Sequence, residues 1–349
     1  MSKNLLFLLF AYSSIFCSAQ SNRKAIDKIV QEELKAFPEV GLVIGISKGS
    51  KTEYYTYGTR SKDSKTKMDS LTVFEIGSAT KTFTSLLLAQ EIAKGNMGAF
   101  DFIDTYLPSG ITLNCKVRKK VLLTDLATHQ SGLPNLSGDQ YFSDLIQKDP
   151  SNPFRSVDED YLFQVLKETD SLSGYRQYQY NNYAFSLLGN ILERKLKMAY
   201  EKLIENQILK PLNMNSTSFN TLKIQNRAGL YNQQGVPQQP MVLNRVNPAG
   251  GLTSNAVDLI RYVKAYLKNK NFAGPRKVVE KTYYEDNKRK LGLGWEIGKD
   301  FLEKDGDTFG NSSLIRYSVK NQIGMVILSN HQNGRLVRNL MNRIYDAVK

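Results

Sequence analysis

The chain has 349 residues, with 47 lysine and arginine residues against 33 aspartate and glutamate residues, and a formal net charge of +14. This length is ample for a large core, as one domain or two interleaved ones. It has only two histidines, far apart, and neither a His-Glu-x-x-His nor a Cys-x-x-Cys pattern, so we predict no metal and no cofactor. Its basic residues are scattered and no nucleic-acid-binding motif accompanies them, which disfavours a nucleic-acid partner. The charge suits solubility and a loose attraction to an anionic cell envelope.

Residues 1–19 have the pattern of a secretory signal. A lysine near the start is followed by an apolar core over residues 5–16 and by three small residues that end at Ala19. The core is too short to span a bilayer. We expect cleavage after Ala19 and a secreted or periplasmic mature chain. Cys115, the one cysteine left after cleavage, cannot form an internal disulfide, and we expect it to be a buried small hydrophobe.

The pattern of apolar residues, together with glycine and proline positions, divides the rest of the chain into helices and strands. The predicted elements are, in chain order, helix 21–37, strands 40–47 and 52–57, helix 78–94 with an apolar stripe, helices 157–169 and 183–196 within a mostly helical middle, helix 256–268, strands 314–319 and 323–328, and helix 335–348.

Strands near both ends of the chain, with helices between them, favour an α+β fold. We predict one antiparallel sheet formed from both chain ends and flanked by helices, with a mostly helical subdomain inserted. The predicted single domain covers residues 20–349. Its α/β part comprises residues 20–75 and 240–349, and its helical part comprises residues 76–239.

Residues 78–81 carry the sequence Ser-Ala-Thr-Lys at the start of a predicted helix. A serine hydroxyl is a poor nucleophile at neutral pH and needs a base beside it. Ser78 and Lys81 are three residues apart, so they share one face of the helix. Gly77 permits a sharp turn into the helix. The N–H of Ser78, at a helix N-terminus, is then a free donor suited to an oxyanion.

Two further segments carry candidate site residues. Residues 180–182, Tyr-Asn-Asn, precede a predicted helix and can aim a phenol and a carboxamide into one cleft. The Tyr180 phenol serves as a base or proton relay only if nearby cations lower its pKa from about 10. Residues 304–306, Lys-Asp-Gly, precede a predicted strand. On an inward-facing edge strand, Lys304 would hold positive charge beside the serine, and Gly306 would let a ligand backbone lie against the strand.

In this order and spacing, the three segments resemble the serine β-lactamase superfamily, most of all its class C branch with the related D-alanyl-D-alanine carboxypeptidases and esterases. Residues 74–81 are similar to the nucleophile motif of that superfamily, residues 180–182 to its Tyr-x-Asn motif, and residues 304–306 to its Lys-Thr-Gly motif. Further similar segments, which extend the resemblance to nearly the whole mature chain, are residues 129–134, 211–214, 250–252 and 292–295. Asp305 departs from the pattern, because Thr or Ser is usual there and a carboxylate would repel a substrate carboxylate.

The resemblance implies a mechanism of acyl transfer through Ser78, in which Lys81 and Tyr180 share the removal and return of its proton. Which of the two is the base stays open. The implied substrate-binding residues, which orient the substrate, supply positive charge and complete the oxyanion hole near residues 306–308, are Asn182, Lys304, Gly306 and Thr308. His129 is predicted to be a structural loop residue, and His331 a surface or cap residue.

We therefore predict a monomeric secreted serine hydrolase that acts on a small-molecule or peptide substrate. A class C-like β-lactamase is the first interpretation. A D-alanyl-D-alanine carboxypeptidase, a D-amidase or an esterase would use the same machinery. A binding or sensor module without catalysis is a further alternative, although it would have no chemical need for Ser78, Lys81, Tyr180 and Asn182 together.

Overall fold

The computed structural model describes residues 23–136, 140–220 and 224–349. The predicted signal segment, residues 1–19, lies outside the described residues. Among the described helices, none has the length and apolar character needed to cross a membrane.

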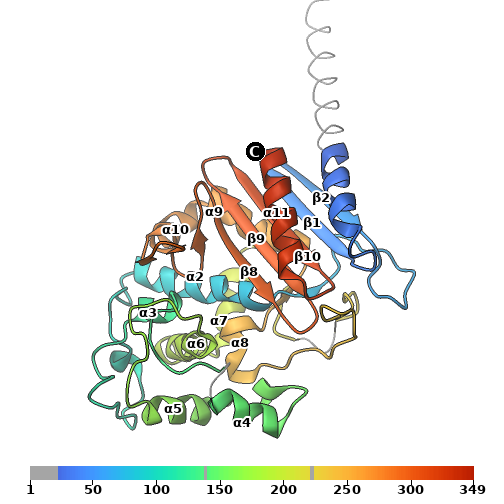
Figure 1. Cartoon of the computed structure of the whole chain (residues 1–349). Helices are drawn as coiled ribbons and strands as arrows, with labels where there is room; N and C mark the ends of the chain where they lie inside the picture. The colour runs from blue at the N-terminus through green and yellow to red at the C-terminus, as the bar shows by residue number, and fades with distance from the viewer. Residues whose placement is uncertain (1–22, 137–139, 221–223) are drawn as a thin grey trace, which may run out of the picture.

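An eight-stranded antiparallel sheet joins the two ends of the chain (Figure 1). Its strand order is β2-β1-β10-β9-β8-β7-β6-β5. These strands are β1 Leu42–Lys48, β2 Lys51–Tyr57, β5 Tyr284–Glu285, β6 Lys290–Leu291, β7 Glu296–Ile297, β8 Leu302–Asp307, β9 Ser312–Ser318 and β10 Ile323–Ser329. The N-terminal hairpin enters the sheet through β1, where Leu42 pairs with Ser329 of β10. The predicted sheet from both chain ends is therefore confirmed.

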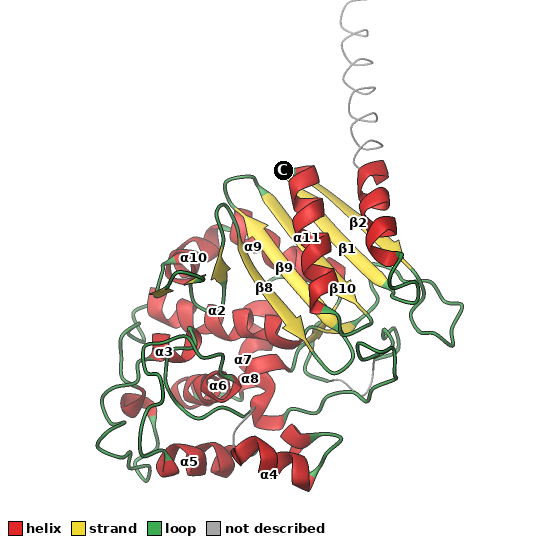
Figure 2. Cartoon of the chain, in the orientation of Figure 1, coloured by secondary structure: helices red, strands yellow, loops and turns green. Residues whose placement is uncertain are grey.

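Helices cover both faces of this sheet (Figure 2). Side chains alternate between faces along a strand. In β1, Leu42 and Ile44 accordingly join the core under the helix of residues 23–34 and α11, Gly334–Val348, whereas Val43 joins the core on the other face. On that other face lies α9, Ala256–Lys268, which packs against β1, β9 and β10.

Six of the remaining helices lie within residues 76–239, and α8 and α10 follow later in the chain. They are α2 Thr80–Ala93, α3 Leu123–Ala127, α4 Gln140–Lys148, α5 Glu159–Glu168, α6 Asn182–Leu196, α7 Tyr200–Ile204, α8 Asn247–Gly250 and α10 Ala273–Glu280. A separate two-stranded sheet pairs β3, Phe74–Glu75, with β4, Thr253–Ser254.

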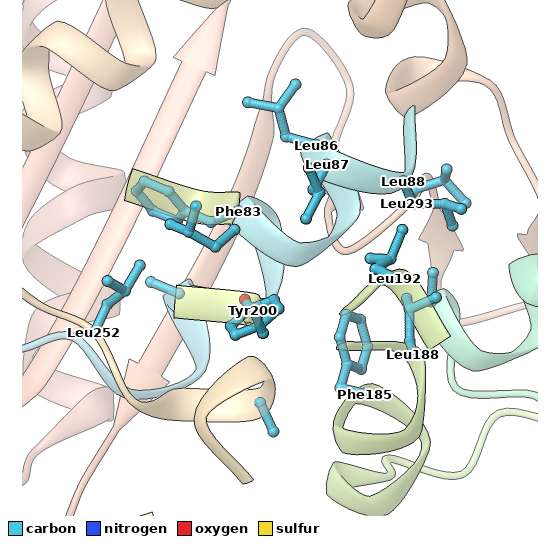
Figure 3. Close-up of a cluster of buried hydrophobic side chains, with 14 of the residues drawn as sticks. Phe83, Leu86, Leu87, Leu88, Phe185, Leu188, Leu192, Tyr200, Leu252 and Leu293 are labelled. Carbon is cyan, nitrogen blue, oxygen red and sulfur yellow. The ribbon is translucent and has the colours of Figure 1, made fainter. Parts of the chain in front are cut away.

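Helix α2 lies in the middle of the molecule, between α9 on one side and α6, α7 and α8 on the other. Figure 3 shows Phe83, Leu87 and Leu88 of α2 in one cluster with side chains of α6. Its polar residues Thr82 and Ser85 are also buried, so α2 is enclosed on nearly all sides rather than along the single apolar stripe that we predicted. A helix held in this way is a rigid support for the residues at its N-terminus.

Two predictions about isolated residues are wrong. Cys115 is exposed, not buried. His331 is buried, not a surface residue: its ring stacks on that of Tyr231, with 4.8 Å between the centroids, and Nδ1 lies 2.8 Å from Asn330 Oδ1. Burial lowers the pKa of His331 to about 4. Burial of a single side chain depends on what the fold brings to it, which local sequence does not contain.

A buried ion pair ties α11 to the sheet. Arg316 of β9 donates from Nε and Nη2 to Glu303 Oε2 of β8, at 2.9 and 2.5 Å, and from Nη2 to Asn342 Oδ1 of α11 at 2.6 Å. Both charged side chains are almost fully buried. Removing one partner of such a pair leaves the other charge buried and incompletely compensated.

We expect Arg316→Met to lower the free energy of unfolding by about 3 kcal/mol, measured by chemical denaturation. The matched control is Arg343→Met, because Arg343 makes exposed pairs with Glu32 and Glu33 that solvent screens, and this variant should lose much less stability. Equal losses of unfolding free energy in the two variants would contradict a larger contribution of the buried pair to stability.

Candidate active site

Ser78 lies in a short 3₁₀ turn, Gly77–Ala79, that leads directly into α2. Gly77 has a φ of +49°, a conformation that glycine adopts without steric cost. One helical turn further on, Lys81 Nζ donates a hydrogen bond to Ser78 Oγ at 3.0 Å. The structure therefore brings together the serine and lysine that sequence spacing placed on one helix face.

The Lys81 ammonium is fully buried and has three acceptors for its three protons. Besides Ser78 Oγ, it donates to Asn182 Oδ1 at 2.8 Å and to the carbonyl oxygen of Ala249 in α8 at 2.6 Å. Burial lowers the pKa of Lys81 to about 8, and the nearby cation Lys304 acts in the same direction. A lysine with such a pKa is partly neutral near physiological pH and is able to accept a proton.

Tyr180, which lies just before α6, also contacts Ser78. Its Oη and Ser78 Oγ share a hydrogen bond, and two ammonium groups lie near its ring, with Lys81 Nζ at 4.8 Å and Lys304 Nζ at 5.2 Å from the centroid. Burial alone would raise the pKa of Tyr180, but the two lysines together lower it. The structure thus supplies the cations that the sequence argument required for a reactive phenol.

His129 holds the backbone on both sides of Tyr180, at Gln179 and at Asn181. The His129 carbonyl oxygen accepts from Gln179 N–H at 2.7 Å, Nδ1 accepts from Asn181 N–H at 3.0 Å, and the ring lies 4.4 Å from that of Tyr180. Burial, with help from Lys304 and Lys81, holds the pKa of His129 well below its usual range, so the imidazole is neutral. His129 is a structural loop residue, as predicted, and it positions the phenol, which was not predicted.

Strand β8 touches the Ser78 turn with no room for a side chain. A Cβ atom at Gly306 would lie 2.1 Å from the carbonyl oxygen of Ile76 and 2.7 Å from Ser78 N, and one at Gly77 would lie 2.6 Å from the Asp307 carbonyl oxygen. We predicted that Gly306 would make room for a ligand backbone. Instead, the turn that holds Ser78 occupies this space.

The part of β8 near Ser78 has one unpaired edge. β8 lies between β7 and β9, but β7 pairs only with Leu302 and Glu303, so strand pairing by β7 ends before Lys304. The Thr308 N–H bonds to Asn311 O at 2.9 Å, on the β9 side. Because successive amides of a strand point to opposite edges, the Asp307 N–H points away from β9 toward the site.

This register changes the predicted donor for an oxyanion. The Thr308 N–H is already used, and its side chain is buried and accepts from Asn311 N–H at 3.0 Å. The Asp307 N–H, which points away from β9, and the Ser78 N–H lie on the two sides of the close contact between β8 and the Ser78 turn, and we assign these two amides as the oxyanion donors. Sequence reasoning placed this donor within residues 306–308 but did not identify it.

Asp305 is paired with a cation from α11. Arg338 Nη2 donates to Asp305 Oδ2 at 2.7 Å, and Lys304 Nζ lies 3.5 Å from Oδ1. Burial alone would raise the pKa of Asp305, but Lys304 and Arg338 lower it, so it is ionised. The predicted repulsion of a substrate carboxylate is therefore reduced by Arg338. No local pattern marked Arg338, whose position depends on how α11 packs.

Two cavities meet at Ser78. The larger has a volume of about 680 Å³ and is lined by Ser78, Tyr178, Tyr180, Asn182, Lys288, Arg289, Glu296, Lys304, Asp305, Gly306, Asp307 and Arg338. The smaller has a volume of about 70 Å³, and its walls include Phe154, Met241, Leu243, Val246 and Thr308. Ser78, Asn182 and Asp307 line both. Among the described residues, no group of His, Cys, Asp or Glu side chains is arranged to hold a metal ion.

The fold and the side chains around Ser78 are those of a serine hydrolase of the β-lactamase type, and comparisons with known proteins agree. The model of the Beta-lactamase family matches residues 26–348. The chain belongs to this family.

Several curated proteins are similar to the chain. It is 26% identical to a beta-lactamase of Pseudomonas fluorescens over 83% of this chain and 78% of that protein. It is 29% identical to a beta-lactamase of Providencia stuartii, over 75% of this chain and 64% of that one. It is 27% identical to Protein flp of Staphylococcus aureus strain N315, over 88% of this chain and 63% of that protein. The chain therefore spans less than two thirds of the length of the last two relatives.

Solved structures share the fold. A beta-lactamase/D-alanine carboxypeptidase from Pseudomonas syringae superposes with a TM-score of 0.80 at 23% identity, covering 93% of this chain and 99% of that one. A class C beta-lactamase superposes with a TM-score of 0.81 at 20% identity, covering 94% of this chain and 97% of that one. At these identities the likeness supports the shared fold.

The contact at Gly306 gives a test of the site geometry. We expect Gly306→Ala to lower the rate of Ser78 acylation at least ~100-fold, because the new Cβ must push the Ser78 turn away from β8 and separate the two amide donors. The rate is measured from intact protein mass after mixing with an acylating probe. Gly110→Ala is the matched control, because a Cβ there meets no atom within 4 Å. Acylation at the unchanged rate in Gly306→Ala would contradict the close contact.

Proposed function

We propose that the chain hydrolyses an amide or ester carbonyl through an acyl-enzyme on Ser78, and that a β-lactam ring is a substrate. The observation that carries this proposal is the position of Ser78 Oγ, which is hydrogen bonded to both Lys81 Nζ and Tyr180 Oη. A serine flanked by two groups of altered pKa, next to two amide donors, has what nucleophilic catalysis needs. Family membership supports the same chemistry.

In the proposed acylation step, Ser78 Oγ forms a bond to the carbonyl carbon and gives its proton to the Lys81–Tyr180 pair. The two groups interact closely, so the proton belongs to the pair rather than to either residue. Lys81 is fully buried, whereas Tyr180 also lines the large cavity. Tyr180 is therefore the member of the pair that gives the proton to the leaving group when the bond between the carbonyl carbon and that group breaks.

Charge that develops on the carbonyl oxygen is stabilised by the Ser78 and Asp307 N–H groups. Burial alone would lower the pKa of Lys304, but Tyr180 and Asp305 raise it above its ordinary value. Lys304 thus stays cationic and stabilises a Tyr180 phenolate. Water then attacks the acyl-enzyme and frees Ser78, and the speed of this second step separates a β-lactamase from a penicillin-binding carboxypeptidase.

An esterase or D-amidase is a second candidate, and the ion pair between Asp305 and Arg338 favours it. Arg338 is engaged by Asp305 and also by Glu303, at 2.5 Å, so it is not a free cation for a substrate carboxylate. The affinity for substrates without a carboxylate at this position would not be lowered by that pairing.

We also propose that the mature protein is secreted or periplasmic. The support is the sequence pattern of residues 1–19, with its apolar core and small residues before Ala19. Cell-wall peptides and β-lactam compounds are both encountered outside the cytoplasm.

Mixing the mature protein with a penicillin tests the proposal directly. We expect catalytic loss of the drug, and a loss of activity of at least ~1,000-fold in Ser78→Ala, measured from drug absorbance and from intact protein mass. A lasting Ser78 adduct without turnover would instead indicate a carboxypeptidase, and the absence of both would favour the esterase or D-amidase. Turnover by Ser78→Ala at the wild-type rate would refute the serine mechanism.

The pH dependence of acylation follows from the lowered pKa of Lys81. Its protonated form cannot accept the Ser78 proton, so we expect the acylation rate to rise with pH through about 8. Stopped-flow measurement of acylation between pH 6.5 and pH 9 gives this profile. Circular dichroism over the same range is the control that the fold is unchanged. A rate that does not change across this range would contradict the participation of Lys81 in the pair that accepts the proton.

A further inference from the structure

One face of β8 carries three acidic residues. Glu303, Asp305 and Asp307 alternate along the strand, so their side chains share one face. Glu303 and Asp305 both accept hydrogen bonds from Arg338 of α11, which shows that this face is turned toward α11. Asp307 is held in a different way. The mechanism proposed above uses the backbone N–H of Asp307 and leaves its carboxylate without a role.

Ser312 joins the Asp307 carboxylate to the start of α11. Asp307 and Ser312 pair directly across β8 and β9, and Ser312 Oγ donates a hydrogen bond to Asp307 Oδ1. The same Oγ accepts from Asn333 N–H at 2.8 Å. Asn333 is the N-cap of α11, and its side chain accepts from Leu336 N–H at 3.0 Å. One buried hydroxyl thus ties the carboxylate to the end of a capped helix.

The first residue of α11 leaves room for this carboxylate. A Cβ atom at Gly334 would lie 2.7 Å from Asp307 Oδ2. The N-terminus of a helix carries partial positive charge, so it favours a carboxylate in this position. This charge and the Ser312 hydroxyl partly offset the negative charge of Asp307, which would otherwise oppose an oxyanion bound to the N–H of the same residue.

The Asp307 N–H needs such an anchor because it lies at a free edge. Among the described strands, none pairs with the outer edge of β8 at this residue, since pairing by β7 ends at Glu303. Asp307 is the last residue of β8, and its exposed side chain lines both cavities, where it could otherwise turn. A displacement of about 1 Å at a reacting centre can cost about 100-fold in rate.

We propose that the Asp307 carboxylate, held by Ser312 and the N-terminus of α11, is a positioning group that keeps the Asp307 N–H directed at the oxyanion. This inference rests on the proposed acyl-enzyme function and adds two positioning side chains to it, those of Asp307 and Ser312. It also links the reaction to α11, whose other contact with the site is the pairing of Arg338 with Asp305.

Ser312→Ala removes the tether, and Ser318→Ala is a closely matched control. Both serines are buried in β9, and the Oγ of each donates one hydrogen bond and accepts one from a backbone N–H. Ser318 Oγ donates to the Asp300 carbonyl oxygen at 2.5 Å and accepts from Asn321 N–H at 3.1 Å, at the other end of β9. The two variants should lose similar unfolding free energy, but only Ser312→Ala should slow acylation of Ser78, by ~30-fold.

Acylation is measured with p-nitrophenyl acetate as the probe. Ser78 Oγ forms a bond to the acetyl carbonyl carbon, the bond from that carbon to p-nitrophenol breaks, and the proton passes from Ser78 to the leaving group through Lys81 and Tyr180. Stopped-flow absorbance over a range of ester concentrations gives the maximal acylation rate and the half-saturating concentration. Loss of positioning should lower the maximal rate and change the half-saturating concentration less than ~3-fold, because the amide acts on the transition state.

Two variants of Asp307 separate its hydrogen bond from its charge. Asp307→Asn keeps an oxygen that accepts from Ser312 and removes the negative charge, so acylation should be faster than in the wild type or within ~3-fold of it. Asp307→Ala removes the acceptor and should slow acylation ~30-fold, as Ser312→Ala does. The double variant Asp307→Ala/Ser312→Ala should be no slower than either single variant, because both substitutions remove the same contact.

The outcomes separate the inference from the function on which it rests. Equal acylation rates in Ser312→Ala and Ser318→Ala would overturn the inference and leave the acyl-enzyme mechanism in place. An Asp307→Asn rate as low as that of Asp307→Ala would also overturn it, and this comparison serves as the test if Ser312→Ala does not fold. If neither the ester nor a penicillin acylates Ser78 in the unchanged protein, the proposed function is wrong and the inference falls with it.

Discussion

The close contact between β8 and the turn before α2 is the constraint on which the site depends. Gly77 and Gly306 have no Cβ atoms, and this lets the backbone of Asp307 approach that of Ser78. The contact places two amide donors beside the nucleophile, and it also joins the sheet to the helical part of the molecule. Because α2 is buried on nearly all sides, the turn cannot move away from the strand without disturbing the core.

Around this contact, ionisable side chains of basic and acidic type follow one another. Tyr180 lies between Lys81 and Lys304, Lys304 lies beside Asp305, and Asp305 is paired with Arg338. Burial makes each charge costly unless the next one compensates it. Burial, with Lys304, lowers the pKa of Lys81, and the two lysines lower the pKa of Tyr180, so the groups around Ser78 also prepare it for reaction.

The chemistry and the selectivity of the site come from different parts of the fold. Residues at the junction of α2, α6 and β8 surround Ser78, and their arrangement would suit any carbonyl of the right geometry. The cavity walls come from other segments, among them the loop with Met241 and Leu243 and the short strands β5 to β7. Substitutions in those segments can change the substrate while the reacting groups stay fixed.

The sequence by itself determined the features that depend on local pattern. Runs of apolar and β-branched residues separated by short turns predicted the terminal hairpins, an amphipathic pattern predicted α11, and a three-residue spacing placed Lys81 beside Ser78. Tertiary structure decided the rest: the burial of His331, the exposure of Cys115, the choice of Asp307 as amide donor, and the roles of His129 and Arg338. These features arise where segments distant in the chain come into contact, and no local pattern contains the identity of a distant partner.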